Sequence, residues 1–345
     1  MIRCGIIGCG GVFRDMYVPA IGGIPELQLV SVCDTDIDKL RPQEMIGGIQ
    51  TLHTDVDEFL EGGQDLDFVI VTTPVFTHYE IGKKVILAGK NVLIEKPLSL
   101  YYEQSAELEA LAKEYGVKVC VGQTWRYREP ILRAIQAMED GLLGEVYQTK
   151  IVHHIGSLLH VSLPPWAWEE RKYRTLLYEH AIHLLDFQVL FGGPVRSVGD
   201  VRFTKEPELG VTSKISALAE HTSGAISFID IQGFSSTKFT TLEIFGTASD
   251  ISIKFFPHSY RIYCGRLNPL DELLTEGKRL VDFVSGRLKD KLIKNRVPAK
   301  AQPHLLLLKD FIRSIESGTT PSPVSIEDVM LTMHFLDLLG EQVYR

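Results

Sequence analysis

The sequence predicts an α/β fold in two parts: a doubly wound parallel sheet, followed by an α+β domain with a mostly antiparallel open sheet. Three observations support this. Short apolar strand patterns alternate with helical patterns over the first third of the chain, a glycine-rich turn follows the first strand, and consecutive strand patterns dominate the second half. Helices between short apolar strands are typical of parallel sheets, whereas strands in series are typical of antiparallel ones.

The first third carries five apolar runs that we expect to be buried strands, and helical patterns at residues 79–88 and 103–115 separate the last three. Parallel strands need crossover connections, which are right-handed, so the pattern indicates one sheet covered by helices. We place this first domain at residues 1–122. The expected strands are residues 2–7, 27–33, 68–72, 91–95 and 117–121.

A second domain is expected at residues 123–345. Its strand patterns follow one another with few helices between them, and turn residues such as Thr222-Ser223-Gly224 separate neighbours as in a hairpin. The expected strands are residues 145–153, 196–203, 213–220, 225–232 and 240–245. The expected helices are residues 130–140, 177–191, 305–317 and 326–339.

Composition and charge describe an ordinary globular chain of 345 residues, 45% hydrophobic and 23% charged. A formal net charge of -8 argues against nucleic-acid binding, which usually needs a basic excess. The five cysteines form no CxxC pair, so we expect buried thiols in a reducing compartment. A strand pattern at the very start leaves no room for a signal peptide, and no apolar run could cross a membrane, so we expect a cytoplasmic protein.

The glycine-rich turn Gly8-Cys9-Gly10-Gly11 follows the first expected strand and precedes a helical pattern. Gly8 permits a tight turn, and Gly10 lets the backbone approach a pyrophosphate at the amino terminus of the helix. Gly11 and Val12 continue the same cofactor-binding turn. The third position of the fingerprint is normally small but is Phe13 here, and a simple tight turn is the alternative.

Asp34 ends the second expected strand. A carboxylate there can accept hydrogen bonds from the ribose 2′-hydroxyl of an adenine dinucleotide, and it would repel a 2′-phosphate. Thr35 and Asp36 follow it, with no arginine immediately after. The sequence therefore predicts NAD as the cofactor rather than NADP, with an ordinary strand-end aspartate as the alternative.

Lys96 stands at the end of another apolar run, Asn91-Val92-Leu93-Ile94-Glu95-Lys96-Pro97. A lysine at the carboxyl end of a nucleotide-binding strand lies where hydride transfer needs an acid or a base. Together with the glycine-rich turn, it indicates a nicotinamide-dependent oxidoreductase that acts on a small polyhydroxylated molecule. A solvated turn lysine is the alternative.

Four stretches carry a resemblance to a known family: GIIGCGGV (5–12), TTPVFTHYEIGKKVILAGKNVLIEKPLSL (72–100), GLLGEV (141–146) and YEHAIHLLDFQVLFG (178–192). The chain resembles the glucose–fructose oxidoreductase/inositol dehydrogenase (Gfo/Idh/MocA) family. The resemblance implies an amino-terminal Rossmann domain that binds NAD(P), and a carboxyl-terminal α/β domain whose open antiparallel sheet commonly builds an oligomer interface. It places the substrate between the domains, over the nicotinamide.

The second stretch matches the family in the order and spacing of Thr73, Pro74, His78, Glu95 and Lys96. The resemblance implies that Lys96 binds the reacting hydroxyl and helps to move its proton. Thr73 and Pro74 match a loop near the nicotinamide. We assign His78 and Glu95 to the cofactor site with them.

The fourth stretch resembles the family signature D-x-G-x-H-x-x-D and reads here Glu179-His180-Ala181-Ile182-His183-Leu184-Leu185-Asp186. His183 matches the catalytic histidine, and its pKa near neutrality suits a base for the substrate hydroxyl. Glu179 replaces the usual aspartate. Because it lies four residues away on the same helix face, it is expected to orient or charge-couple the base.

His180 is an additional histidine in this signature, and we expect it to be a second polar contact to the substrate or the cofactor. Together with Glu179 and His183 it could bind zinc by residue type. No HExxH pattern is present, however, and we expect no metal. Asp186 is expected to support the helix rather than the chemistry.

Further substrate contacts are expected in two segments. Residues 123–127 follow the fifth strand and match a family stretch that reaches toward the substrate, with Arg126 as the expected contact. Residues 166–174 form a basic, aromatic loop that includes Trp168 and Arg174. Such a loop suits a sugar that carries a carboxylate or a nucleotide diphosphate, and a solvated loop face is the alternative.

A basic segment at residues 278–296 has no place in this chemistry, with seven basic and two acidic residues and an apolar residue at every fourth position from Leu280 to Leu292. Such an amphipathic helix could lie on a membrane surface. The preferred interpretation is that it covers the domain or a neighbouring subunit.

The sequence thus predicts an NAD-dependent dehydrogenase or reductase of a sugar, inositol or sugar derivative, acting as a homo-oligomer, either dimer or tetramer. Lys96 and His183 handle the proton, and Glu179 supports the base. Two alternatives stay open: a hydrolase that uses bound NAD to cleave glycosidic bonds, and a non-catalytic regulator that binds dinucleotide. The sequence leaves the substrate, the reaction direction and the subunit count open.

Overall fold

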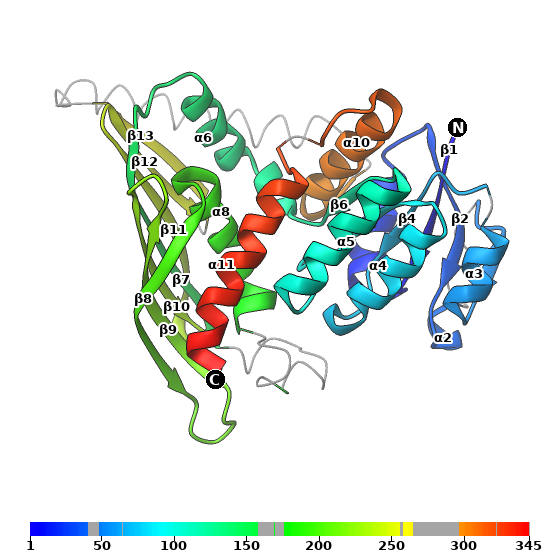
Figure 1. The fold of residues 1–345 in the computed structure, drawn as a ribbon, viewed down its shortest axis with the longest axis horizontal. Coiled ribbons are helices and arrows are strands. Elements are labelled where there is room, and N and C mark those ends of the chain that lie inside the picture. The colour runs from blue at the N-terminus through cyan, green and yellow to red at the C-terminus, as the bar shows by residue number, and fades with distance from the viewer. Residues whose placement is uncertain are drawn as a thin grey trace.

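Two sheets organise the chain, one in its amino-terminal part and one in its carboxyl-terminal part (Figure 1). Trp168, Arg174 and the basic segment 278–296 lie outside the residues described. Of the helices within the described ranges, none is long and apolar enough to span a membrane. The computed structural model describes residues 1–40, 48–63, 65–157, 169, 176–255, 258–264, 297–321 and 323–344.

The first sheet consists of six parallel strands: β1 (Ile2–Ile7), β2 (Leu27–Cys33), β3 (Thr51–His53), β4 (Phe68–Val71), β5 (Asn91–Ile94) and β6 (Val119–Val121). Their order is β3-β2-β1-β4-β5-β6. The apolar residues of β4 are buried throughout because helices cover the sheet. The strand order reverses between β1 and β4, and open α/β sheets bind ligands at such a point, outside the carboxyl ends of the strands.

Helices cover this sheet in two groups. The helices α3, α4 and α5 lie side by side, whereas α1 lies against α10. Asp55 begins α3 because its carboxylate accepts from two backbone N–H groups of the first turn, and Gly116, with a φ of 66°, ends α5. The elements are a π-helical turn (Phe13–Tyr17), α1 (Val18–Ile21), α2 (Ile37–Leu40), α3 (Val56–Gly62), a 3-10 turn (Val75–Thr77), α4 (His78–Leu87), α5 (Tyr102–Tyr115) and α10 (Gln302–Ser317).

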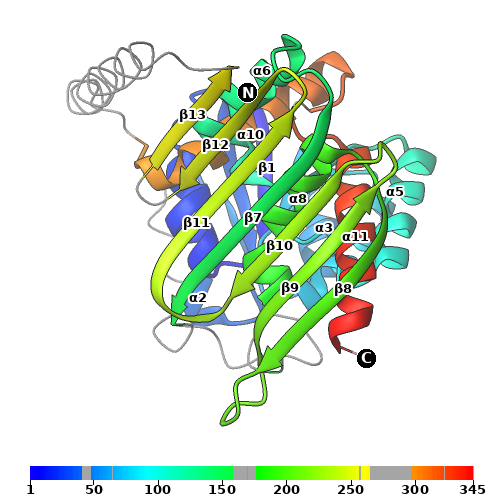
Figure 2. The ribbon, with the colours of Figure 1, turned by 90° about the vertical axis from the view of Figure 1, so that its left-hand side faces the viewer.

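The second sheet consists of seven strands: β7 (Val146–Ser157), β8 (Val195–Lys205), β9 (Thr212–His221), β10 (Ile226–Gln232), β11 (Phe234–Gly246), β12 (Ser249–Phe255) and β13 (His258–Cys264). Their order is β13-β12-β11-β7-β10-β9-β8, and only the β7 and β10 neighbours run parallel. One face packs on α8 (Ile182–Gly192) and α11 (Ile326–Tyr344). Figure 2 looks onto the opposite face, which no described helix covers. The predicted fold class is therefore confirmed.

The last two helices join the two parts of the molecule. Helix α10 packs on α1, and the ring of Phe311 lies 5.3 Å from the ring of Phe68 in β4. Helix α11 contacts α5 on one side and α8 and β8 on the other. The predicted division at residue 122 falls just after β6. Helix α10 lies beyond this division in the sequence but packs on the first part, so the division stays a proposal. The remaining elements are α6 (Glu129–Glu139), a π-helical segment (Leu176–Ala181) and 3-10 turns at Thr124–Tyr127 and Ala299–Ala301.

Candidate functional site

The glycine-rich turn connects β1 to the first helix. Gly8 has a φ of 101°, and a Cβ there would lie 2.8 Å from the Thr72 carbonyl carbon and the Thr73 nitrogen, so this position requires glycine. A Cβ at Gly10 or Gly11 would meet no atom within 4 Å. The turn therefore leaves open space beside its backbone at a helix amino terminus, as a pyrophosphate requires.

The helix after this turn passes through the π-helical turn Phe13–Tyr17 before it continues as α1. Phe13, the large residue at the third fingerprint position, is fully buried in the core of the first part. It is therefore accommodated by apolar packing, away from the open side of the turn. Val12 is 42% exposed at the beginning of the helix.

Asp34 connects the end of β2 to the glycine-rich turn. Its Oδ2 accepts the Cys9 N–H at 2.8 Å, and its Oδ1 accepts the Asp36 N–H at 2.9 Å. The Lys39 ammonium lies 3.5 Å from Oδ1. Each carboxylate oxygen can accept a further hydrogen bond, so Asp34 can still receive a ribose hydroxyl.

His78 holds two loops of the site together. Its Nδ1 lies 2.7 Å from the Pro97 carbonyl oxygen, and its Nε2 lies 2.8 Å from the Thr73 carbonyl oxygen. Burial lowers the pKa of His78, while the two carbonyls act in the opposite direction. The buried ring thus fixes the Thr73-Pro74 loop against the turn after β5, which is a positioning role beside the predicted cofactor site.

Glu95 is buried at the end of β5, where the Tyr17 hydroxyl donates to it at 2.7 Å and the Lys96 backbone N–H at 3.2 Å. His304 Nε2 lies 3.7 Å away, and a Cβ on Gly122 would come within 2.9 Å of the carboxylate. Burial alone would raise the pKa of Glu95, but His304 and the hydrogen-bond donors outweigh burial and lower it. The carboxylate is satisfied within the protein and fixes the backbone that carries Lys96.

Lys96 reaches from the first sheet to the second part of the molecule. Its Nζ lies 2.8 Å from Glu179 Oε2 and 3.3 Å from the Glu179 carbonyl oxygen. Glu179 belongs to the π-helical segment Leu176–Ala181, so the α-helical spacing assumed from the sequence does not apply. Within the described part of the chain, Glu179 forms no hydrogen bond or ion pair with His183. The expected support of the base by Glu179 is therefore not seen, and Glu179 positions Lys96 instead.

His183 lies in the first turn of α8 and is 7% exposed. Its Nδ1 is 2.9 Å from Gln123 Oε1, and its ring stacks on Trp125 with centroids 5.0 Å apart. Because an amide oxygen only accepts, Nδ1 carries the proton and Nε2 presents its lone pair. Burial lowers the pKa of His183 well below its usual value, and the Lys96 and Arg128 charges add to this. The imidazole is therefore neutral at pH 7, as a base must be.

His180 lies between these groups in sequence, and the structure leaves its Nε2 buried without a hydrogen-bond partner among the described residues. Burial lowers the pKa of His180 to about 4, and the Lys96 charge acts in the same direction. His180 is thus a neutral ring with one unused nitrogen, and it keeps its place among the proposed polar contacts. Over the described ranges, no cluster of three or more His, Cys, Asp or Glu side chains could hold a metal ion.

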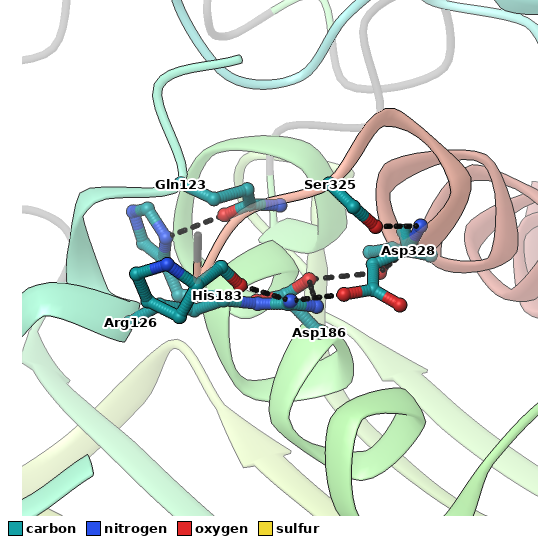
Figure 3. A network of polar contacts seen from close by, with 8 residues as sticks. Gln123, Arg126, His183, Asp186, Ser325 and Asp328 are labelled. Carbon is teal, nitrogen blue, oxygen red and sulfur yellow. Dashed lines mark hydrogen bonds and ion pairs between the residues drawn. The ribbon is translucent and has the colours of Figure 1, made fainter. Parts of the chain in front are cut away.

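Arg126 belongs to a buried ion-pair network (Figure 3). Its Nε and Nη2 donate to the two oxygens of Asp186 at 2.7 and 2.8 Å, and its Nη1 donates to Asp328 at 2.6 Å and to the Pro323 carbonyl at 2.8 Å. The side chain is 0% exposed. This position does not fit the predicted substrate contact, because the guanidinium is enclosed and all three of its nitrogens donate to protein oxygens. We therefore leave Arg126 out of the substrate site.

Gln123 and Trp125 are two residues of the candidate site that were not among the predicted contacts. Both follow β6, so they stand at the same sheet edge as Lys96, and this placement was the available signal. Which of residues 123–127 faces His183 depends on the course of a 3-10 turn that the residue types do not reveal. The charge of Arg126 suggests a functional contact in the sequence, but the structure uses this charge inside the protein.

Together these residues form one continuous edge at the carboxyl ends of β1, β2, β4, β5 and β6, which the segment before α8 closes from the other side. The open glycine turn and the Asp34 carboxylate match the pyrophosphate and the ribose of an adenine dinucleotide. The residues present therefore fit NAD. The lysine and the neutral histidine lie on either side of the contact between this edge and the segment before α8.

Comparisons with known proteins agree with this arrangement. Residues 2–123 match the family described as "Oxidoreductase family, NAD-binding Rossmann fold", and residues 131–252 match the "GFO/IDH/MocA C-terminal domain". An uncharacterised oxidoreductase of Synechocystis sp. is 24% identical over 341 residues, which cover 92% of this chain and 88% of that protein. D-apiose dehydrogenase of Paraburkholderia graminis is 25% identical over 225 residues, which cover 65% of this chain and 59% of that protein.

Among solved structures, the WlbA dehydrogenase from Bordetella pertussis, in complex with NADH and UDP-GlcNAcA, resembles the whole chain with a TM-score of 0.80. The two share 19% sequence identity, and the match covers 99% of this chain and 94% of that one. At this identity the likeness shows the fold. Since the two halves match the two domains of one family in the same order, the chain belongs to the Gfo/Idh/MocA family of oxidoreductases, with an NAD-binding Rossmann domain.

Proposed function

We propose that this protein is an NAD-dependent dehydrogenase or reductase that transfers a hydride between nicotinamide and a carbinol or keto carbon of a sugar, inositol or sugar derivative. One observation carries the proposal. The Lys96 ammonium, held by Glu179 at 2.8 Å, extends from the cofactor sheet to the segment that carries the neutral His183. A cation and a base from the two parts of the molecule thus share one site, as oxidation of a hydroxyl requires.

The cofactor would be held by Gly10, Gly11 and Asp34, with Thr73 and Pro74 beside the nicotinamide. When bound, NAD supplies the acceptor for the hydride. The Asp34 carboxylate favours NAD over NADP because it would repel a 2′-phosphate. His78 fixes the Thr73-Pro74 loop, and Glu95 fixes the backbone at Lys96, through buried polar contacts within the protein.

The protein handles the proton and the charge. Lys96 donates a hydrogen bond to the reacting oxygen of the substrate, and Glu179 keeps the ammonium in place. His183 accepts the proton of the reacting hydroxyl at Nε2. The hydrogen on the carbon that bears this hydroxyl leaves with its electron pair as a hydride. The side-chain oxygen of Gln123 meanwhile accepts the hydrogen bond from the N–H at Nδ1. In the reducing direction the same nitrogen returns the proton to the carbonyl oxygen.

Replacing Lys96 by Ala tests the proposal. A panel of polyols, uronates and nucleotide sugars, read by NADH absorbance, first identifies the best substrate. The variant should then lose about 10²–10⁴-fold in kcat because the charge on the reacting oxygen is no longer stabilised. Its dissociation constant for NAD should stay within about twofold, since the glycine turn and Asp34 are untouched.

Lys84→Ala is the matched control, because Lys84 forms an exposed ion pair with Asp57 on the surface of the first part. It should keep both turnover and NAD affinity. Full turnover in the Lys96 variant would refute the assigned role of Lys96. Release of a sugar from a glycoside without net NADH would instead favour the NAD-dependent hydrolase. The cytoplasmic location and the homo-oligomer stay predictions.

A further inference from the structure

Arg128 stands two residues after the buried Arg126 and has very different surroundings. Its guanidinium carbon lies 3.8 Å from the centre of the Trp125 ring and 5.9 Å from the centre of the Phe255 ring. The side chain is half-buried. The planar cation therefore rests on an aromatic surface, which attracts it but satisfies none of its five N–H donors.

The guanidinium of Arg128 has no carboxylate and no hydrogen-bond acceptor among the residues that the structure describes. Nearby arginines contrast with it: Arg126 is paired with Asp186 and Asp328, and Arg133 is paired with Glu129 at 2.7 Å. Burial lowers the pKa of Arg128 to about 10, and no anion compensates for the lost hydration. Arginine pairs with carboxylate or phosphate groups through two parallel hydrogen bonds, so the N–H donors of Arg128 are available to an incoming anion.

The position of Arg128 relative to the reacting groups follows from the ring stack. The indole of Trp125 lies nearly parallel to the His183 ring, with an angle of 6° between the planes, and the guanidinium stacks on the same indole. The charge of Arg128 is close enough to act on the pKa of His183. Arg128 and His183 thus both stack on the same indole, so the guanidinium belongs to the surroundings of the proposed base.

We propose that Arg128 binds an oxyanion carried by the substrate, either a carboxylate or a phosphoryl group, and thereby makes the site selective for an acidic sugar. The inference rests on the proposed function and refines its substrate class. In this arrangement the reacting hydroxyl of the substrate lies between Lys96 and His183. The anionic substituent is attached a few bonds away on the same sugar and contacts the guanidinium of Arg128 beside Trp125. The rigid guanidinium fork matches either oxyanion with two parallel hydrogen bonds.

Binding to the NADH-loaded enzyme, measured by quenching of NADH fluorescence, tests this without turnover. The probes are glucuronate, galacturonate and mannuronate for a carboxylate, glucose 6-phosphate for a phosphoryl group, and the neutral parent sugars glucose, galactose and mannose. The wild type should bind at least one anionic probe more tightly than its parent. In Arg128→Gln that probe should lose about tenfold or more in affinity, while the parent sugar changes by less than about twofold.

The uronates and glucose 6-phosphate show whether Arg128 prefers a carboxylate or a phosphoryl group. Arg128→Lys keeps the charge but loses the fork, so it should retain part of the preference. The matched control, Arg133→Gln on the exposed face of α6, should leave the preference unchanged. Lys96→Ala should lose turnover yet keep the preference for the anionic probe, which separates the oxyanion site from the proposed chemistry.

Three results would overturn the inference. In the first, no anionic probe binds the wild type better than its neutral parent. In the second, Arg128→Gln weakens the anionic and the neutral probe equally, which would mean that the residue only packs against Trp125. In the third, Arg133→Gln removes the preference as well, which would indicate a general effect of surface charge.

Discussion

At the scale of single residues, the contact between Gln123 and His183 sets the tautomer of the proposed base. The amide oxygen at 2.9 Å accepts from Nδ1, so the neutral tautomer exposes Nε2. An amide adds no charge, and the pKa of His183 is lowered by burial and by neighbouring cations. The base form therefore persists well below pH 6.5, where an exposed histidine would be protonated.

This gives an expectation for the pH dependence of the reaction. Protonation of His183 removes the base, so the acid limb of kcat/KM should lie below pH 6.5 in the wild type. In Gln123→Glu a carboxylate faces Nδ1 and stabilises the imidazolium, so the limb should move upward by about one unit or more. Gln136→Glu, at an exposed position on α6, should leave the profile unchanged. An unshifted limb in the Gln123 variant would mean that another group controls it.

The glycine-rich turn offers a second test on single residues. Gly10→Ala adds a methyl group where no atom lies within 4 Å, so the free protein should keep its melting temperature while NAD affinity falls by about tenfold or more. Gly8→Ala instead places the methyl 2.8 Å from backbone atoms at a positive φ, and should cost about 1 kcal/mol or more of stability. Calorimetry and NAD titration of both variants check this. Equal effects of the two variants would contradict the different roles given to these glycines.

At the scale of elements, one buried cation connects three segments of the second part. Arg126 follows β6, Asp186 lies in α8 and Asp328 lies in α11, and Thr332 of α11 also donates to Asp186 at 2.9 Å. All three guanidinium nitrogens and both Asp186 oxygens take part in these hydrogen bonds, and a well-satisfied polar network of this kind makes a protein interior rigid. The network therefore fixes α8, and with it the orientation of His183.

Arg126→Met should destabilise the fold by about 3–5 kcal/mol, because it leaves the Asp186 carboxylate buried without a counterion. The double variant Arg126→Met/Asp186→Leu should recover part of this loss, since no charge is then left unpaired. Urea denaturation measures both changes. Arg196→Met breaks an exposed pair with Glu220 and should cost less than about 1 kcal/mol. If Arg126→Met also cost less than about 1 kcal/mol, a structural role for the network would be ruled out.

At the scale of the whole molecule, the uncovered face of the second sheet is the surface most suited to a second copy. Ile226 and Phe228 are 41% and 40% exposed on β10, on the face opposite the buried Ile229 and Ile231. We expect Phe228→Asp to lower the molar mass measured by light scattering toward that of a monomer, since it buries a charge in the contact. Leu87→Asp, which changes a 44% exposed residue on α4, should keep the mass of the wild type. A monomeric wild type would contradict the expected homo-oligomer.

How far the fold could be predicted from the sequence depends on the length of each signal. The apolar runs of β1, β2, β4 and β5 are long enough to be recognised, and the observed strands agree with them. Strand β3 has only three residues and offers no alternation. Strand β12 does alternate, with Ile251, Ile253 and Phe255 buried, so it could have been predicted.

The sequence indicated candidate residues for the site, but it did not indicate the contacts between them. Motif order indicated Lys96 and His183, whose positions the structure brings together. The partner of Glu179 could not be predicted, because it depends on a π-helical segment that changes which side chains share a face. Arg126 and Arg128 look equivalent in sequence, and only packing shows that one is enclosed by carboxylates while the other lies on Trp125.

The return of α10 to the first sheet has a consequence for how the chain folds as it is synthesised. Phe311 completes the apolar core around Phe68, although the two lie 243 positions apart in the sequence. When only β1 to β6 have left the ribosome, the nascent chain therefore lacks helix α10, which covers part of the apolar core of this sheet. The cofactor-binding part cannot reach its final stability until nearly the whole protein has been made. A fragment that ends at residue 122 should therefore expose the apolar surface around Phe68 and aggregate, however complete its sheet.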